Sequence, residues 1–309
     1  MLDVRRLRLL RELQARGTVT AVAEALSYTP SAVSQQLATL EREAGVSLLE
    51  RRGRGLQLTD AGRGLVDHAD AVIARLELAE AELAAAAGGE VAGRARVAAF
   101  QTAASSLVLP LLGTLPEAHP RLRLELGEME AEEGLDLLRR GEVDLVVAEE
   151  YDYAPRPRDP TLEVSELSRD PLLLVLPAAH PLCAADPDVA PLAQLAGERW
   201  AFARSGTAFD DLLARACRAL GGFEPEIRHR SNDINVLERL VAAGEAVTLL
   251  PALGQPGGVP GVAVRRVAEQ PLDRTIFIAV RRGSGGRPAL RAVAQALREQ
   301  ARTLGLPGA

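Results

Sequence analysis

Three short amphipathic segments follow one another at the N-terminus, and their spacing constrains the fold more than any other feature of the chain. The first, residues 4–16, repeats apolar side chains at helical spacing and ends at Gly17. The second follows Thr20 as its N-cap, and the third begins with Thr29 as N-cap and Pro30 in the first helical position. The expected inward-facing residues are Val4, Leu7, Leu10, Leu13, Val22, Ala25, Leu26, Val33, Leu37 and Leu40. Short helices joined by a tight turn predict a helix-turn-helix.

A basic, glycine-containing turn comes next. The sequence "RRGRG" at 51–55 lies between two short apolar runs, "VSLL" and "LQL". Two short strands around such a turn would form a wing beside the helices.

A long helix is expected from Thr59, as its N-cap, to about Ala87. Apolar residues along it alternate at spacings of four and three, the a/d pattern of a coiled coil: Leu65, Ala69, Val72, Leu76, Ala79 and Leu83. Charged neighbours keep this seam narrow, which favours pairing with a second copy of the helix. The alternative is a helix that packs against its own domain. "AGGEVAG" at 87–93 then predicts a hinge.

Strand-like and helix-like segments alternate from residue 94 onwards. "RARVAAF", "RLRLELGE" and "VDLVVAEE" are typical of strands with helices between them, which predicts a parallel α/β sheet. A second series runs from "LLLVLP" to the final helix "PALRAVAQALREQARTL". The expected parts are a winged helix-turn-helix (1–58), a linker helix (59–89), lobe I (90–160 and 266–309) and lobe II (161–265). A ligand cleft is expected between the lobes.

Composition limits the classes of function. The chain has 309 residues and a net charge of −6, so bulk charge does not favour nucleic acid. Residues 1–63, however, carry ten Arg against seven acidic residues. Two distant cysteines, Cys183 and Cys217, favour a reducing cytoplasm over a disulfide framework or a zinc site. No signal peptide and no membrane-spanning segment is predicted.

No sequence pattern points to catalysis. The GxSxG, HExxH and P-loop patterns are missing, and "GSGGRP" at 283–288 lacks the Lys of a phosphate loop. The four histidines are scattered. We therefore expect a protein that is not an enzyme, with no catalytic residues, no metal site and no cofactor.

The third helix exposes small polar side chains on the face opposite its buried stripe. In a helix-turn-helix, this helix enters the major groove, where Ser and Gln can bind base edges. Arginines on the wing would meet phosphates or the minor groove. The predicted DNA contacts are Thr29, Pro30, Ser31, Ser34, Gln35, Arg51, Arg52 and Arg54. Ordinary solvated residues of a small helical domain are the alternative.

The segment "GTVTAVAEALSYTPSAVSQQLATLEREAGVSLLERRGRGLQLTDAG" resembles the winged-helix domain of LysR-type transcriptional regulators nearly position by position. "LLLVLPAAHPL" and "LVAAGEAVTLLP" are similar to segments of that family's effector domain. The resemblance implies a bacterial homodimer or homotetramer that binds double-stranded promoter DNA and, if an activator, RNA polymerase. It also implies a two-lobed effector domain like a type 2 periplasmic binding protein. Gln35 stands where many members carry Arg, so the resemblance does not fix the operator sequence.

Candidate effector-binding residues lie on turns that follow strands. "FQTAASS" offers hydroxyls beside free helix N-terminal amides, which accept an anion, although such residues are also ordinary caps. The resemblance adds residues from "WAFARSGTAF", and "HRSND" and a glutamate that follows a strand complete the set. The candidates are Thr102, Ser105, Glu130, Arg204, Ser205, Thr207 and Ser231. An amino acid or another carboxylate is the expected effector.

Two other functions stay open from the residues alone. One is a plain solute-binding protein of the same α/β type. The other is a regulator whose C-terminal domain binds no small molecule and acts only through DNA and oligomer contacts.

Overall fold

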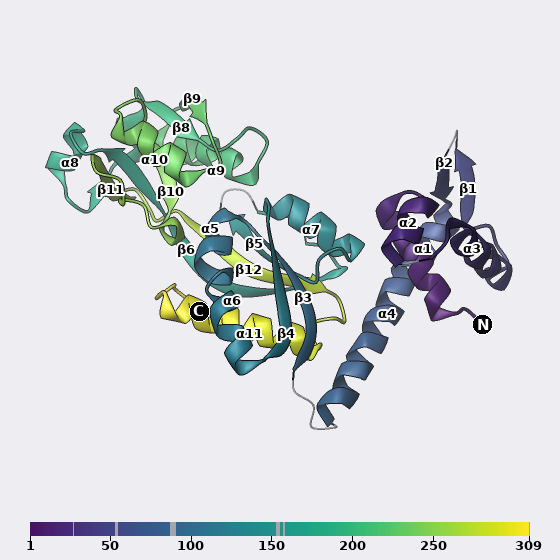
Figure 1. Ribbon diagram of the computed structural model, residues 1–309. Helices are drawn as coiled ribbons and strands as arrows, with labels where there is room; N and C mark the ends of the chain where they lie inside the picture. The colour runs from purple at the N-terminus through teal and green to yellow at the C-terminus, as the bar shows by residue number, and fades with distance from the viewer. Residues whose placement is uncertain (27, 53–54, 87–90, 153–154, 157, 309) are drawn as a thin grey trace.

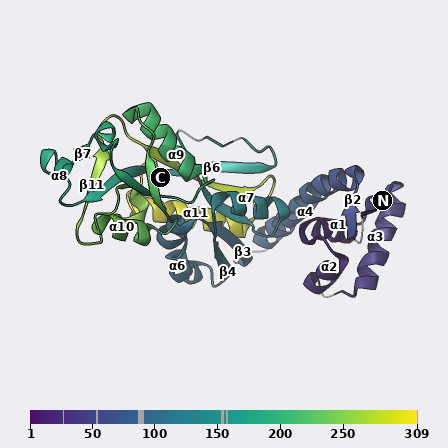
Figure 2. The ribbon, with the colours of Figure 1, turned by 90° about the horizontal axis from the view of Figure 1, so that it is seen from above.

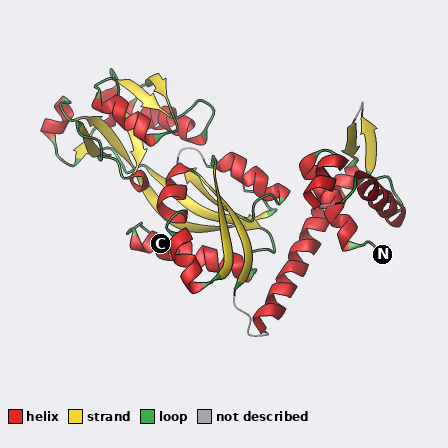
Figure 3. Cartoon of the chain, in the orientation of Figure 1, coloured by secondary structure: helices red, strands yellow, loops and turns green. Residues whose placement is uncertain are grey.

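The computed structural model describes residues 1–26, 28–52, 55–86, 91–152, 155–156 and 158–308. A helical head at the N-terminus is followed by one long helix and a two-lobed α/β body (Figure 1). Strands are concentrated in the body, and the described strands of the head form one small hairpin (Figure 3). The predicted fold class is therefore confirmed.

The head consists of α1(Val4–Arg16), α2(Val19–Leu26) and α3(Pro30–Ala44). Leucines and valines of all three helices share one buried cluster, largely as their spacing predicts. The inward position predicted for Leu26 was wrong: this side chain, at the end of α2, is 36% exposed. α1 ends at Gly17 with φ 74°, a left-handed conformation that glycine adopts without a Cβ clash. Thr29 caps α3, with its Oγ1 accepting from the amide of Ala32. The prediction of Thr20 as the cap of α2 was wrong: the amide of Ala21 donates to Thr18 Oγ1 at 3.2 Å, because the helix begins earlier.

The wing and the long helix follow. β1(Leu49–Arg52) pairs antiparallel with β2(Gly55–Leu58), and α4(Asp60–Ala86) extends from the head towards the body. Thr59 caps α4, since its Oγ1 accepts from the amide of Gly62 at 3.0 Å.

The first half of α4 packs inside its own head. Val66, Ala69 and Ile73 are buried in the cluster formed by α1 and α3. Val72 and Leu76, in contrast, are 43% and 40% exposed. The predicted a/d seam is therefore not continuous. In the first half of α4, the buried face includes Val66 and Ile73, which are not part of that seam. The alternative of a helix packed on its own domain holds for this half.

One sheet runs through both lobes. Its strand order is β4-β3-β5-β12-β6-β11-β7, with β10 also paired to β6. The strands of lobe I are β3(Ala92–Ala99), β4(Arg121–Glu128), β5(Leu145–Tyr151) and β12(Asp273–Arg281). β3 pairs parallel with β4 and β5, as predicted, but β12 pairs antiparallel with β5 because the chain returns from lobe II in the opposite direction.

Helices cover both faces of the lobe I sheet (Figure 2). They are α5(Gln101–Ala103), the π-helical turn η1(Ala104–Val108), α6(Leu111–Ala118), α7(Ala131–Arg140) and α11(Pro288–Thr303). η1, α6 and α11 share one hydrophobic cluster with the sheet, and α7 shares another on the opposite face.

Lobe II is built around the long strand β6(Leu162–Pro177). Its other strands are β7(Val189–Ala190), β8(Arg199–Phe202), β9(Glu226–Arg230), β10(Thr248–Pro251) and β11(Val262–Val267). Its helices and helical turns are α8(Pro181–Ala185), η2(Leu192–Leu195), α9(Ala208–Ala216), η3(Cys217–Gly221), α10(Ile234–Ala242) and η4(Ala252–Gly254). β6 pairs with β12 in its first part and with β10 and β11 in its second, so it joins the two lobes.

A buried ion pair lies where β6 passes between the lobes. Arg274 Nη2 is 2.7 Å from Asp170 Oδ2, and the two residues are 3% and 0% exposed. The other oxygen of Asp170 accepts from the amide of Leu253 in η4 at 2.9 Å. Arg274 also donates to Thr102 Oγ1 at 2.7 Å and lies over the ring of Phe100. The pair therefore connects β6 and β12 to α5 of lobe I and to η4 of lobe II.

Asp170→Asn should destabilise the protein by roughly 3–5 kcal/mol, because it leaves the Arg274 guanidinium buried without its counter-charge. Urea unfolding followed by circular dichroism measures this loss. Asp136→Asn is the matched control, since Asp136 pairs with Arg139 at the surface, where such pairs contribute about 0–1 kcal/mol. Equal effects of the two substitutions would contradict the structural role of the buried pair.

Candidate functional site

α3 presents a polar face outside the head core. Val33, Leu37 and Leu40 are buried against the other helices, so Ser34 and Gln35 are exposed on the opposite side. Pro30 occupies the first turn, and the hydroxyls of Thr29 and Ser31 lie 3.1 Å apart at the helix start. The N-terminal half of α3 therefore offers short polar groups.

The wing lies beside α3 in the head (Figure 1). Leu49 pairs with Leu58 and Arg52 with Gly55 in the β1–β2 hairpin. The backbone of Arg51 and Arg52 thus lies on β1, whereas Arg54 falls outside the described residues. The predicted wing contacts stay a prediction.

A cleft of about 50 Å³ lies between the two lobes, with residues from both along its walls. Lobe I contributes Phe100, Gln101, Thr102, Glu130, Glu149, Tyr151 and Arg274. Lobe II contributes Ala203, Thr207, Phe209, Ser231, Asn232, Ile234, Leu237 and Pro251. The rings of Tyr151 and Phe209 stack across it with their centroids 5.3 Å apart.

Glu149, on β5, is a buried acid in this cleft. It is 5% exposed, and its Oε2 has no hydrogen-bond partner among the described residues. Burial raises the pKa of its carboxyl group to about 7, and nearby Glu130 adds to the rise, while Arg274 and Arg156 oppose it. Near neutral pH this carboxyl group is therefore poised between its neutral and charged forms.

Glu130 connects the two lobes directly. It precedes α7, and its Oε1 accepts a hydrogen bond from Asn232 Nδ2 of lobe II at 2.5 Å. Asn232 Oδ1 in turn accepts from the amide of Arg204 at 2.8 Å. Burial raises the pKa of Glu130, and neighbouring Glu132 adds to the rise. The cleft therefore holds two carboxyl groups whose charged forms are disfavoured.

Four of the seven predicted effector residues come together at the cleft. They are Thr102, Glu130, Thr207 and Ser231. The other three, Ser105, Arg204 and Ser205, are exposed and do not line it. The Ser105 hydroxyl donates to the carbonyl of Thr102 within its own turn at 3.1 Å.

The turn at "FQTAASS" lies against a buried arginine. Thr102 Oγ1 accepts from Arg274, and the amide of Ala104 donates to the carbonyl of Phe100 at 2.8 Å. No side chain caps the amides at the start of α5, so the anion site expected at this turn stays a prediction. Arg274 and Asn232 were missed as cleft residues, because nothing local in "DRTIFIAV" or "HRSND" shows which lobe they meet.

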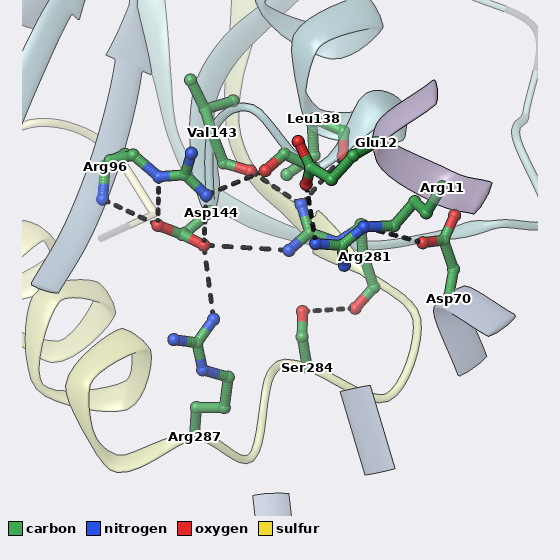
Figure 4. Close-up of polar contacts among 11 residues, drawn as sticks. Arg11, Glu12, Asp70, Arg96, Leu138, Val143, Asp144, Arg281, Ser284 and Arg287 are labelled. Carbon is green, nitrogen blue, oxygen red and sulfur yellow. Dashed lines mark hydrogen bonds and ion pairs between the residues drawn. The ribbon is translucent and has the colours of Figure 1, made fainter. Parts of the chain in front are cut away.

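A polar junction connects the head to lobe I (Figure 4). Arg11 of α1 lies 3.8 Å from Asp70 of α4, and its Cζ is 3.9 Å from the position that a Cβ on Gly141 would take. Gly141 ends α7, and beside it Arg281 Nη1 donates to the carbonyls of Leu138 and Val143. The C-terminal end of α7 therefore contacts the head.

Asp144 anchors the lobe I side of this junction (Figure 4). Three arginines surround it: Arg96 at 3.0 Å, Arg287 at 3.3 Å and Arg281 at 3.7 Å. Burial alone would raise the pKa of Asp144, but the hydrogen bonds from Arg96 and the surrounding positive charges outweigh it and lower the pKa. This carboxylate therefore stays charged and fixes the arginines next to α7.

Two further observations bear on the class of site. In the described part of the chain, no group of three or more His, Cys, Asp or Glu side chains is arranged to hold a metal ion. Across the described ranges, the helices are too short or too polar to form a bilayer-spanning segment.

Comparison with known proteins places this architecture in a family. Residues 4–63 match the bacterial regulatory helix-turn-helix protein of the lysR family, and residues 88–302 match the LysR substrate binding domain. The chain belongs to the LysR family of transcriptional regulators. It is a DNA-binding regulator with a C-terminal effector-binding domain, so a plain solute-binding protein is ruled out.

Relatives and solved structures agree with this assignment. The chain is 29% identical to the DNA-binding transcriptional dual regulator OxyR of Escherichia coli K12, over 96% of this chain and 95% of that one. It is 33% identical to the regulator ShiR of Corynebacterium glutamicum, over 74% and 79% of the two chains. Full-length OxyR from Pseudomonas aeruginosa has the same fold, with a TM-score of 0.73, 24% identity and coverage of 96% and 98%. Full-length CbnR in complex with its target DNA gives a TM-score of 0.56 at 23% identity, covering 97% and 100%.

Glu149→Gln should stabilise the protein relative to wild type at about pH 8, and much less at about pH 5. A pKa raised in the folded state contributes stability that is full below the ordinary value of 4.5 and is lost as pH rises through about 7. Urea unfolding of both proteins at the two pH values measures the difference. Glu133→Gln on exposed α7 controls for the lost charge. An equal gain at both pH values would contradict the burial of an unpaired carboxyl group.

Proposed function

We propose that the protein reads operator DNA with the N-terminal half of α3 and with its wing. The observation that carries this proposal is the exposed face of Ser34 and Gln35, in a head that matches the family model. Recognition helices of this class place their first turns in the major groove, where Gln binds adenine edges. Thr29, Pro30 and Ser31 would lie near the DNA backbone, and the wing arginines would bind phosphates.

We propose a homodimer, or a tetramer built from dimers, in which two α4 helices pair. α4 exposes Val72 near its midpoint and Leu76 and Leu83 in its second half, and Leu83 is 72% exposed. A partner helix would cover these side chains, since the first half of α4 is already used by the head. Pairing would also place two heads together, as binding to two half-sites requires.

A small molecule bound between the lobes is proposed to regulate this activity. The cleft combines aromatic walls with a few convergent polar groups, the usual character of such sites. Of the two expected effector classes, an amino acid fits better than a simple carboxylate, because it carries an ammonium group that Glu130 and Glu149 could bind. We also propose domain limits at residues 58, 89, 160 and 265, and a cytoplasmic location. If the protein is an activator, it would also contact RNA polymerase.

α7 is the proposed route from the cleft to the head. At its start Glu130 is hydrogen-bonded to Asn232 of lobe II, and at its end Gly141 lies against Arg11 of the head. A ligand that changes the angle between the lobes would therefore move α7 and bias the position of the head. Two arrangements of different DNA affinity would then exchange with ligand binding.

Induction by hydrogen peroxide, named for several relatives, is not carried over to this chain. A peroxide-reactive cysteine needs an accessible thiolate of lowered pKa. Cys217 is buried, and burial together with Glu224 raises the pKa of its thiol to about 12. Cys183 is half-buried, and its Sγ lies 3.6 Å from the carbonyl of Pro177.

Ser34→Ala and Gln35→Ala should each weaken binding to DNA upstream of the protein's own gene, by about 1–3 kcal/mol for each lost base contact. Arg51→Ala should weaken binding to all sequences alike and lower the salt dependence, because it removes a phosphate contact. Mobility shift at two salt concentrations measures both effects. Gln14→Ala, on the exposed side of α1, is the control. Wild-type affinity in both α3 variants would contradict the proposed reading face.

A further inference from the structure

Acidic side chains outnumber basic ones among the described lining residues of the cleft. Glu130 and Glu149 both line it, and Arg274 is the one basic side chain among the described lining residues. This imbalance bears on the chemistry of the effector. The inference drawn from it rests on the proposed function of the cleft as the effector site.

The Nε and Nη2 atoms of Arg274 are engaged by the protein. Its Nε and Nη2 donate to Asp170 at 2.9 and 2.7 Å, and Nη2 also donates to Thr102. The ring of Phe100 covers its face, 4.7 Å from Cζ. An anionic ligand would therefore have to compete with the Asp170 carboxylate for Nε and Nη2.

Arg156, the other arginine whose charge lowers the pKa of Glu149, is also engaged. Arg156 Nε donates to the backbone carbonyl of Glu149 at 2.8 Å, and its Nη2 pairs with Glu132 at 2.9 Å. Neither contact reaches the Glu149 carboxyl group. Glu149 Oε2 is thus a buried acceptor at the cleft that no described residue satisfies.

A buried acceptor without a partner is costly and rare in native proteins. A ligand that donates a hydrogen bond would remove this cost, and a positively charged donor would also compensate the two carboxyl groups. The rings of Tyr151 and Phe209 and the side chain of Ile234 provide an apolar wall for the rest of the molecule. The free space of about 50 Å³ is far below the 300–1,000 Å³ of drug-sized pockets, which limits the ligand to a small one.

We propose that the effector is a small amine, whose ammonium group binds between Glu149 and Glu130 and whose short apolar body packs against Tyr151 and Phe209. The ammonium group takes the hydrogen-bonding position that Glu149 Oε2 leaves open. Binding draws Glu149 into its charged form. Because burial holds the pKa of this group at about 7, protons are released on binding near neutral pH.

Three series of matched chain length test this proposal on the full-length protein: propyl-, butyl- and pentylammonium, the corresponding alkanols and the corresponding alkanoates. Thermal unfolding at constant ionic strength and about pH 7.5 should show a rise in Tm with the ammonium ions alone. Calorimetric titration with butylammonium in phosphate and in Tris should give heats that differ, since released protons ionise the two buffers differently. Equal heats would overturn the proton release.

Glu149→Gln and Glu130→Gln should each weaken butylammonium binding about ten-fold or more, because each removes a charge-assisted contact. Glu133→Gln, on the exposed side of α7, should leave the binding unchanged. Circular dichroism checks that each variant is folded. If Glu149→Gln does not fold, Glu130→Gln still tests the proposal. Unchanged affinity in both cleft variants would overturn the proposal.

The remaining outcomes separate this inference from the proposed function. A Tm rise with alkanoates but not with ammonium ions would overturn the cationic effector and leave the cleft as a sensor of anions. No shift with any series would also overturn the small-amine effector. Failure of the regulator itself would appear separately, as loss of specific DNA binding by the wild-type protein without any ligand.

Discussion

The buried pair of Asp170 and Arg274 holds the body of this protein together at the point where its two lobes meet. β6 and β12 carry the two residues from one lobe to the other, and the pair also binds Thr102 of lobe I and the amide of Leu253 of η4. Because the two charges compensate each other, the base of the cleft is nearly neutral. The charge that a ligand meets is therefore set by the acids above it, Glu130 and Glu149.

One of these acids, Glu130, connects the cleft to the N-terminal head through α7. Glu130 at the start of the helix binds lobe II, and Gly141 at its end lies against Arg11. Asp144 and its arginines brace the same end of the helix. A rigid element with one end in a ligand site and the other against a second domain is a physical means of coupling the two, provided that both ends have alternative arrangements.

Much of the fold follows from local signals. The caps at Thr29 and Thr59, the terminator Gly17 and the apolar periodicity of α1 and α3 set helix limits that the structure reproduces. Long-range placement could not be predicted in the same way. The a/d pattern of α4 was misassigned because burial of Val66 and Ile73 depends on α1 and α3. In the cleft, four predicted residues lie together, whereas Arg274 and Asn232 enter only through strand pairing and lobe closure. The sequence around Arg274 and Asn232 does not indicate that these two residues line the cleft.

The central claim is that the angle between the lobes controls DNA binding, and it can be tested without knowing the effector. Gln101 Nε2 of lobe I lies 3.5 Å from Asp233 Oδ1 of lobe II. In a protein whose native Cys183 and Cys217 have been replaced, Gln101→Cys and Asp233→Cys can therefore be bridged by a short bis-thiosulfonate. Operator affinity would be measured with and without the bridge, using single-cysteine variants with a monofunctional reagent as controls. Our account predicts a change of about five-fold or more, within the usual range of allosteric coupling. Identical affinities of the bridged and open proteins would contradict it.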